Sequence, residues 1–495
     1  MLLVTLLAVL LNAHGLVHAS LNSMPPNLTH GAGSPVGVRA LLPPTMVPRM
    51  VSAVSTLTLD QRLRQVLQQL GIRRAHFGAG YAGDAVTLVR CLAESVASLT
   101  LVCPFQMPAE PLRSFGSRVL ICHGDRGPGA ATSRRLLAAL PEAQDLPLDD
   151  YADAAWADAI ADRGANIGPV WLSFLESWTQ PAQLEPVSLP AREGEIAGIR
   201  YRVQGSGPPL VLLPLSLARS QWDPLVPTLA EHYTTIVLGG AFLGIIPSLE
   251  ERMRGGYQRV VQSVVEAADV RAGERVLEVG CGSGAVVRWL ARFTGGANPI
   301  TALDVNDYLL HEADALTTAA GLAETITFQK GDAEHLPLPS ESIDVALSFT
   351  VMEEVDAERM LAEMVRVTRP GGRIGIVVRA TDMRPWINIS LHSDLMQAVE
   401  SAAGVGVAEL GCSDASLYRR FHEAGLQPLL LGPQLAPNLP EQTPERLRTF
   451  VGRVAQTLAP DDAKALRSAV EQAVKAGTML WAEPYHCAVA SLPSR

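Results

Sequence analysis

The stretch RVLEVGCGSGAV, Arg275 to Val286, decides the fold of the second half of this chain. Its apolar start predicts a buried strand, and the glycines that follow predict a sharp turn, because a residue without a Cβ lets the backbone turn tightly and approach a ligand. The next run, AVVRWLARF, has apolar residues at helical spacing. Read as Gly280-x-Gly282-x-x-Ala285, the turn also satisfies the loose dinucleotide fingerprint. A glycine turn alone is weak evidence, so the rest of the chain has to identify the ligand.

Composition and charge exclude several classes of protein. With 495 residues the chain is too long for one ordinary core, which predicts two or more domains. A net charge of -10 argues against a nucleic-acid partner, because phosphate contacts need clustered Lys and Arg. The cysteines are scattered without a CxxC pair, which predicts neither a metal site nor a disulfide framework. They are Cys91, Cys103, Cys122, Cys281, Cys412 and Cys487.

Strands alternate with helical patterns through most of the chain, which predicts α/β architecture in both halves. We expect an apolar leader and a Pro/Gly-rich linker over 1–50. Two α/β segments follow, over 51–180 and 181–249, with a Pro-spaced region between them. A further α/β unit is predicted over 250–495, with a helical insertion at about 437–477.

The first residues, MLLVTLLAVLLNAHGLVHAS, are apolar and end in residues that fit a signal-peptide cleavage site. They lack the positively charged n-region of a secretory signal peptide, and they are too short for a membrane span, which needs about 20 apolar residues. Met24 is an alternative start. We therefore expect a cytoplasmic protein without an integral membrane span, while export or membrane association through this leader stays open.

Further features follow the glycine turn in order. Asp304 ends the next strand, about 20 residues on, where a carboxylate accepts bonds from ribose hydroxyls. Gly331-Asp332-Ala333 precedes a strand that begins near Ile343. A helix, the turn Arg369-Pro370-Gly371-Gly372 and another strand complete the series.

Together these features, from Val276 to Val378, resemble the class I methyltransferases that use S-adenosylmethionine, and among them the quinone- and sterol-modifying type. The resemblance implies a Rossmann-like domain and S-adenosylmethionine as cofactor. In that family the acid before the turn helps to hold the methionine ammonium, and the acid after the third strand accepts from the adenine amino group. The implied cofactor-binding residues are Glu278, Gly280, Cys281, Gly282, Gly284, Asp304, Val305, Asp332 and Ala333.

The implied reaction is O-, N- or C-methylation of a small-molecule acceptor by in-line displacement. Where many relatives carry paired histidines, this chain has Glu353 and Glu354. Glu353 is therefore a candidate catalytic carboxylate, able to take a proton or to attract a cationic amine. We favour the alternative that these residues form a solvated acidic turn. Trp386 lines the acceptor pocket or belongs to the core, and His311 is expected on a helix surface.

Residues 57–180 resemble the C-terminal half of an α/β-hydrolase and residues 196–240 its N-terminal half, so the order is swapped as in a circular permutation. In the turn Gly78-Ala79-Gly80-Tyr81-Ala82-Gly83, glycine stands where the family has its nucleophile. Asp125 stands near the acidic position, Tyr151 is the nearest substitute for the histidine, and Leu215-Ser216 replaces the His-Gly of the oxyanion hole. Without a triad, a packed scaffold or regulatory domain is expected.

Three alternatives remain: a non-catalytic S-adenosylmethionine-binding regulatory protein, an active hydrolase, and a nicotinamide-dependent oxidoreductase on the same turn. The acceptor, the general base and the oligomeric state stay open.

Overall fold

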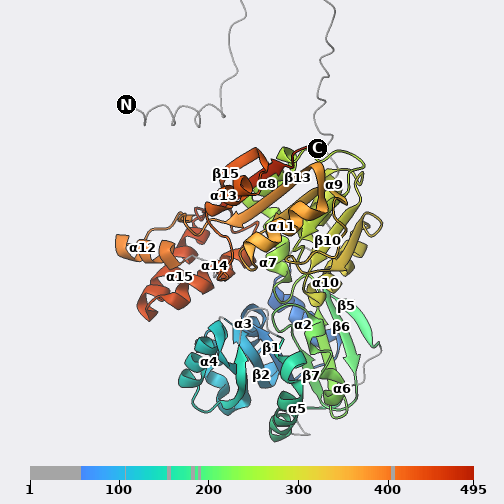
Figure 1. Cartoon of the computed structure of the whole chain (residues 1–495). Coiled ribbons are helices and arrows are strands. Elements are labelled where there is room, and N and C mark those ends of the chain that lie inside the picture. Colours follow the sequence, from blue (N-terminus) through green and yellow to red (C-terminus); the bar gives the residue numbers. More distant parts are fainter. Residues whose placement is uncertain are drawn as a thin grey trace, which may run out of the picture. The chain divides into compact units, whose positions relative to one another are not determined.

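The computed structural model describes residues 57–494 apart from 106, 153–157, 180–183, 188–190 and 403–406. It contains two eight-stranded sheets, one built from strands between Ala75 and Gly239 and one from strands between Val276 and Ser491 (Figure 1). The predicted leader and linker lie outside the described residues. Among the described residues, no helix has the length and apolar character that a bilayer crossing requires.

The first sheet has the order β4-β3-β2-β1-β7-β8-β6-β5. Neighbouring strands are parallel except around β6, which is antiparallel to both β5 and β8. The sheet is buried on both faces: adjacent residues of β2, Leu101 and Val102, belong to different hydrophobic clusters. The strands are β1 (Ala75–Tyr81), β2 (Val96–Phe105), β3 (Val119–Arg126), β4 (Gln144–Ala152), β5 (Glu193–Ile196), β6 (Ile199–Gln204), β7 (Pro209–Leu212) and β8 (Thr234–Gly239).

Helices join these strands as the periodicity predicts. The first helix among the described residues is α2, where Thr58 and Gln61 form a capping box that satisfies amides of the first turn. The helices are α2 (Leu59–Gln69), α3 (Ala82–Cys91), α4 (Gly127–Ala139), α5 (Ala159–Trp178) and α6 (Val226–Leu229), with 3-10 turns η2 (Ala93–Ser95), η3 (Glu110–Arg118) and η4 (Arg219–Trp222).

The second sheet has the order β11-β10-β9-β12-β13-β16-β14, and β15 also pairs with β16. Strands β9 to β13 are parallel, while β16 is antiparallel to its three neighbours. The order reverses between β9 and β12, and ligands bind at such a switch point outside the carboxyl ends of the strands. The strands are β9 (Val276–Val279), β10 (Ile300–Asp304), β11 (Ile326–Lys330), β12 (Ile343–Phe349), β13 (Thr368–Arg379), β14 (Trp386–Ile387), β15 (Gln427–Asn438) and β16 (Trp481–Ser491).

The two helices α14 and α15 fall within the range 437–477 and lie beside α12 (Figure 1). The amphipathic helix before the glycine turn is α8, whose buried Val260 and Val264 belong to the core of the second sheet. The helices of this half are α7 (Ile246–Glu251), η5 (Arg252–Arg254), α8 (Gly256–Ala267), α9 (Ala285–Phe293), α10 (Asp307–Ala319), α11 (Ala357–Val367), α12 (Ser393–Ala402), α13 (Ser416–Glu423), α14 (Pro444–Thr457) and α15 (Pro460–Lys475).

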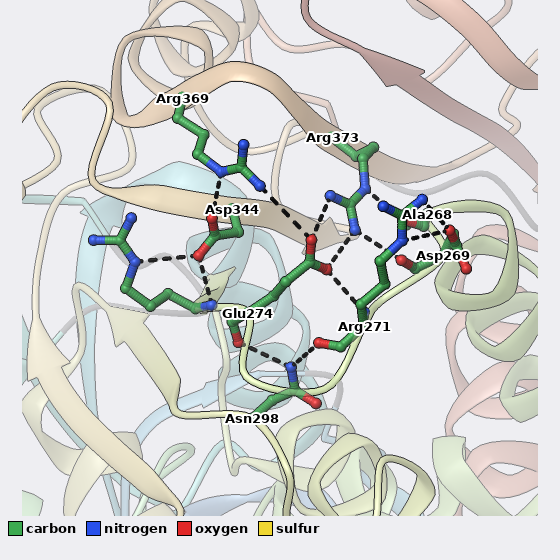
Figure 2. A network of polar contacts seen from close by, with 9 residues as sticks. Ala268, Asp269, Arg271, Glu274, Asn298, Asp344, Arg369 and Arg373 are labelled. Carbon is green, nitrogen blue, oxygen red and sulfur yellow. Dashed lines mark hydrogen bonds and ion pairs between the residues drawn. The ribbon is translucent and has the colours of Figure 1, made fainter.

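A polar network ties together the amino ends of β9, β12 and β13 (Figure 2). Both carboxylate oxygens of Glu274 accept from the guanidinium of Arg373, at 2.9 and 2.5 Å. Asp344 accepts from Arg275 and from Arg369. The Arg-Pro-Gly-Gly turn that helped to identify the second half therefore lies at the edge opposite the glycine turn, where it holds strands in place.

Candidate active site at the carboxyl edge of the second sheet

The glycine turn after β9 has a backbone that only glycine adopts without strain. Gly280, Gly282 and Gly284 have φ angles of +76°, +53° and +75°. The amides of Gly280 and Cys281 both donate to the carbonyl of Leu303, at 2.7 and 2.8 Å. A Cβ on Gly280 would lie 2.1 Å from Cγ2 of Val351, so this position has no room for a side chain.

Asp304 ends β10 directly beside this turn, as predicted. Its Oδ2 accepts from the amide of Gly282 at 2.8 Å, and its Oδ1 accepts from the amide of Asn306 at 2.9 Å. Burial raises the pKa of this carboxyl. Each oxygen retains a second acceptor site, so Asp304 can also bind ligand hydroxyls. Val305 follows with its side chain 66% exposed, which places an apolar surface next to the carboxylate.

Glu278 lies within β9, and its side chain is buried. Its Oε2 has no hydrogen-bond partner among the described residues. Burial raises the pKa of Glu278 to about 8, while the nearby cations Arg252 and Arg288 lower it and the carboxylate of Asp304 raises it. A buried carboxyl with one unpartnered oxygen beside a glycine turn indicates the place of a cationic ligand group.

Two residues absent from the sequence motif hold the glycine turn. Glu250 accepts from the hydroxyl of Ser283 at 2.6 Å and from Arg288 at 2.5 and 2.6 Å. Arg288 also donates to the carbonyl of Ser283 at 2.6 Å. Sequence reasoning missed both, because Glu250 precedes the turn by 33 residues and no local spacing connects them.

Arg252 places a further cation at this edge. Its Nη2 donates to the hydroxyl of Thr350 at 2.6 Å, and its guanidinium lies 4.3 Å from the centre of the Tyr257 ring. Thr350, directly after β12, has a φ of +62°, a strained value for a β-branched residue. Arg252 forms no ion pair within the part of the chain that the structure describes, which leaves its charge available near Glu278.

Asp332 and Ala333, the residues predicted to bind adenine, follow β11 at the same edge of the sheet. The amide of Gly331 donates to the carbonyl of Asp304 at 3.0 Å, which joins this loop to the end of β10. Asp332 accepts from the amide of Glu334 at 2.8 Å and keeps an exposed carboxylate. Ala333 is buried. The structure therefore brings all the predicted cofactor residues to one edge of the sheet.

The interpretation of Glu353 and Glu354 as a solvated turn is wrong for Glu353. Its side chain is fully buried, and its oxygens accept from the backbone amide and from Nη1 of Arg379, the last residue of β13. The buried ion pair keeps the carboxylate away from solvent. Glu354 is exposed, as the solvated turn requires. His311 is exposed on α10, as predicted.

A cavity of about 270 Å³ opens at the end of β13 and the start of β16. Its walls include Phe450 and Arg453 of α14, together with Asp382, Glu483 and Tyr485. Asp382 is held by a 2.7 Å contact with Nε2 of His486. Trp386 does not belong to this lining, and it is 51% exposed, so neither predicted role fits it: the short strand β14 turns the indole outward.

The hydrolase-like turn in the first half has no room for a nucleophile. A Cβ on Gly80 would lie 2.6 and 2.7 Å from the carbonyl oxygens of Leu215 and Val102. Asp125 accepts from the amide of Tyr151 at 3.0 Å, and the Tyr151 hydroxyl donates to Asp162 at 3.2 Å. These contacts are structural.

Comparison with known families identifies the second half. Residues 277–376 match the family described as a methyltransferase domain. The matched segment runs from β9 into β13 and contains the glycine turn, Asp304 and Asp332. The prediction of a methyltransferase domain in the second half is thereby confirmed.

Individual methyltransferases are similar over the same region. The methyltransferase GfsG of Streptomyces halstedii is 36% identical over 139 residues, which cover 27% of this chain and 49% of that protein. The ubiquinone/menaquinone biosynthesis C-methyltransferase UbiE of Saccharophagus degradans is 28% identical, over 26% of this chain and 53% of its own. The demethylmenaquinone methyltransferase of Lactobacillus johnsonii is 33% identical, over 25% and 51%. The chain thus spans about half the length of these relatives.

Proposed function

We propose that residues 250–495 form a methyltransferase that uses S-adenosylmethionine to methylate a small-molecule acceptor. The observation that carries this proposal is the buried Glu278 carboxyl beside the glycine turn, whose Oε2 has no hydrogen-bond partner among the described residues. A dinucleotide would bring an anionic pyrophosphate to this position, which disfavours ionisation of Glu278. The ammonium of S-adenosylmethionine is a cation that favours the ionised carboxylate, so the residues present fit this cofactor.

The predicted side chains then have roles that their positions support. Glu278 would hold the methionine ammonium, and Asp304 would accept from the ribose hydroxyls beside the exposed apolar side chain of Val305. Asp332 and the amide of Ala333 would hold the adenine. The cofactor supplies an electrophilic methyl group on a sulfonium. The chain contributes by holding the acceptor in line with that methyl, and positioning of this kind accounts for much of the acceleration in such reactions.

The cavity at the ends of β13 and β16 is the proposed acceptor site. It opens at the same edge as the glycine turn, because Arg379 and Tyr485 pair across β13 and β16 at their carboxyl and amino ends. Its volume suits a small molecule. Its lining combines the ring of Phe450 with the carboxylates of Asp382 and Glu483, so the acceptor we expect has an apolar part and a polar group. Because Glu353 is engaged by Arg379, we place no proton transfer on it.

For residues 51–249 we propose a degenerate, circularly permuted α/β-hydrolase-like scaffold. Two observations support this proposal. The two segments join into one sheet through the parallel pair β1 and β7, and when β5 to β8 are counted before β1 to β4, the sheet runs 1-2-4-3-5-6-7-8. The carbonyl oxygens of Leu215 and Val102 leave no room for a side chain at Gly80, which supports a non-catalytic role. The use of S-adenosylmethionine, an intracellular cofactor, favours the cytoplasm as the location.

Two measurements test the proposed function. Calorimetric titrations with S-adenosylmethionine and with nicotinamide dinucleotides should show binding of the first alone; the reverse would refute the cofactor assignment. Incubation with methyl-labelled S-adenosylmethionine and a panel of small phenols, quinols and amines should then label an acceptor. Binding without any transfer would favour a regulatory protein that only binds the cofactor.

A further inference from the structure

Helix α14 begins without a cap from its own N-terminal residue. The hydroxyl of Thr443, the N-cap, donates to the carbonyl of Leu439 at 3.1 Å and makes no bond to the helix. Oε2 of Glu251 accepts instead from the first-turn amides of Glu445 and Arg446, at 2.8 and 3.1 Å. The amides that a Thr cap would satisfy are therefore satisfied by a carboxylate 194 residues earlier in the chain.

The side chain of Glu251 is buried, so this contact is not a surface ion pair. Burial raises the pKa of Glu251 to about 7; the carboxylate of Glu445 raises it as well, while the two amides and the guanidinium of Arg254 lower it. A buried carboxylate at a helix N-terminus is also favoured by the helix dipole. Glu251 thus fixes the start of α14 by both hydrogen bonds and charge.

The residues on either side of Glu251 contact the cofactor edge. We call residues 249–252 the strap. Leu249 lies 3.7 Å from where a Cβ on Gly282 would stand, Glu250 holds the glycine turn through Ser283, and Arg252 donates to Thr350. Consecutive residues of one short segment therefore contact the glycine turn, helix α14 and the end of β12.

The middle of α14 forms a wall of the cavity. Phe450 and Arg453 line it, and the Phe450 ring stacks on Trp481 with centroids 6.4 Å apart. Arg446, whose amide is capped by Glu251, pairs through its guanidinium with Glu483, which also lines the cavity. The position of α14 on the strap therefore sets the shape of the cavity.

We propose that Glu251 is a positioning residue that couples the glycine turn to the acceptor cavity by fixing α14 to the strap. This proposal rests on the proposed function, because it takes the turn as the cofactor site and the cavity as the acceptor site. A ligand that stabilises the turn against the strap then also stabilises α14, and by reciprocity an ordered α14 favours that ligand. Cofactor binding is expected to complete the acceptor cavity.

Hydrogen–deuterium exchange on the full chain tests this coupling, with S-adenosylhomocysteine as the ligand. In the wild type, the ligand should slow exchange over 444–457. In Glu251→Ala without ligand, which removes the acceptor oxygen, first-turn amides of α14 should exchange roughly three- to thirtyfold faster, the range that loss of a cap produces. The ligand should no longer protect α14 in this variant, although it still binds. Glu251→Asp, which keeps the charge, should restore part of the protection.

Glu445→Ala is the matched control, because it removes a carboxylate from the same turn while keeping the backbone amide that Glu251 caps. Its exchange should follow the wild type. Unchanged protection of α14 in Glu251→Ala, or equal loss in Glu445→Ala, would overturn the proposal. If Glu251→Ala does not fold, the comparison of Glu251→Asp with Glu445→Ala decides in the same way. If S-adenosylhomocysteine does not bind the wild type, the proposed function fails, and the ligand-free exchange rates still test the anchoring of α14.

Discussion

The carboxylate of Asp304 accepts a 2.8 Å hydrogen bond from the backbone amide of Gly282, so the end of β10 fixes the middle of the glycine turn. Replacing Asp304 with alanine should weaken S-adenosylmethionine binding at least tenfold, about the worth of one hydrogen bond to a charged group, because both the turn and the ribose lose an acceptor. Calorimetry measures the affinity. Asp304→Asn, which retains one acceptor oxygen, should bind with intermediate affinity. Equal affinity of Asp304→Ala and the wild type would refute the assignment of this residue.

Cofactor binding should release a proton from Glu278. Its pKa of about 8 means that the carboxyl is mostly protonated at neutral pH, and an incoming ammonium favours the ionised form. Affinity should therefore rise with pH up to about 8 and then level off. Calorimetry in phosphate and in Tris, which have different ionisation enthalpies, measures the proton count. Glu278→Gln should bind more weakly and release no proton from this site; identical proton release in that variant would contradict the prediction.

Arg252 should set the pH at which this release occurs. Its cation lowers the pKa of Glu278, so Arg252→Gln raises that pKa further and moves the rise in affinity to higher pH. At neutral pH the variant should bind S-adenosylmethionine more weakly than the wild type. Arg254→Gln is the control, because Arg254 is an exposed neighbour that does not contribute to the pKa of Glu278. If the pH at which affinity rises shifts equally in both variants, the loss of any positive charge in this region has the same effect, and the specific role of Arg252 is contradicted.

Glycines at two positions of the turn should differ in their tolerance of alanine. In Gly282→Ala the only atom within 4 Å of the new Cβ belongs to Leu249, at 3.7 Å. The substitution therefore costs mainly the strain of alanine in the left-handed backbone region, about 1–2 kcal/mol. Gly280→Ala has the same backbone cost and places its Cβ 2.1 Å from Val351, which adds about 1–3 kcal/mol of overpacking. Urea unfolding gives both losses of stability. Equal losses would mean that Val351 moves aside without cost.

Restoring a serine at Gly80 should not restore a hydrolase. The new Cβ would stand 2.6 and 2.7 Å from two backbone carbonyl oxygens, which no change of rotamer relieves. We expect Gly80→Ser to lower the melting temperature and to resist a fluorophosphonate probe. Gly164→Ser in α5, where nothing lies within 4 Å of the added Cβ, should keep the wild-type melting temperature. Probe labelling of Gly80→Ser, or of the wild type, would contradict the scaffold assignment of this half.

Local patterns predicted much of the second half correctly. The strand, turn and helix around Gly280 follow from apolar periodicity and from glycines that take positive φ, both of which depend on neighbouring residues alone. Asp304 and Asp332 were predicted because each stands next to a strand whose end is visible in the sequence. The turn at Arg369 was equally diagnostic, although the structure shows it at the opposite edge, where it binds Asp344.

The residues that the sequence did not reveal act through contacts between distant segments. Glu250 and Arg288 hold the turn across 38 residues, and Glu251 caps α14 across 194. The burial of Glu353 was missed because its partner Arg379 stands 26 residues later, at the end of another strand. A carboxylate near a turn has the same local pattern whether it faces solvent or a guanidinium.

The sequence by itself determined the α/β class of the second half, the glycine turn and the acids at its strand ends, because periodicity, chirality and backbone sterics are local. Only the tertiary structure decided which charges are buried, which are paired and which remain without a partner. Those outcomes depend on desolvation and on distances between elements, which no spacing along the chain specifies. They left Oε2 of Glu278 without a hydrogen-bond partner among the described residues, joined Glu251 to α14, and placed two backbone carbonyl oxygens against Gly80.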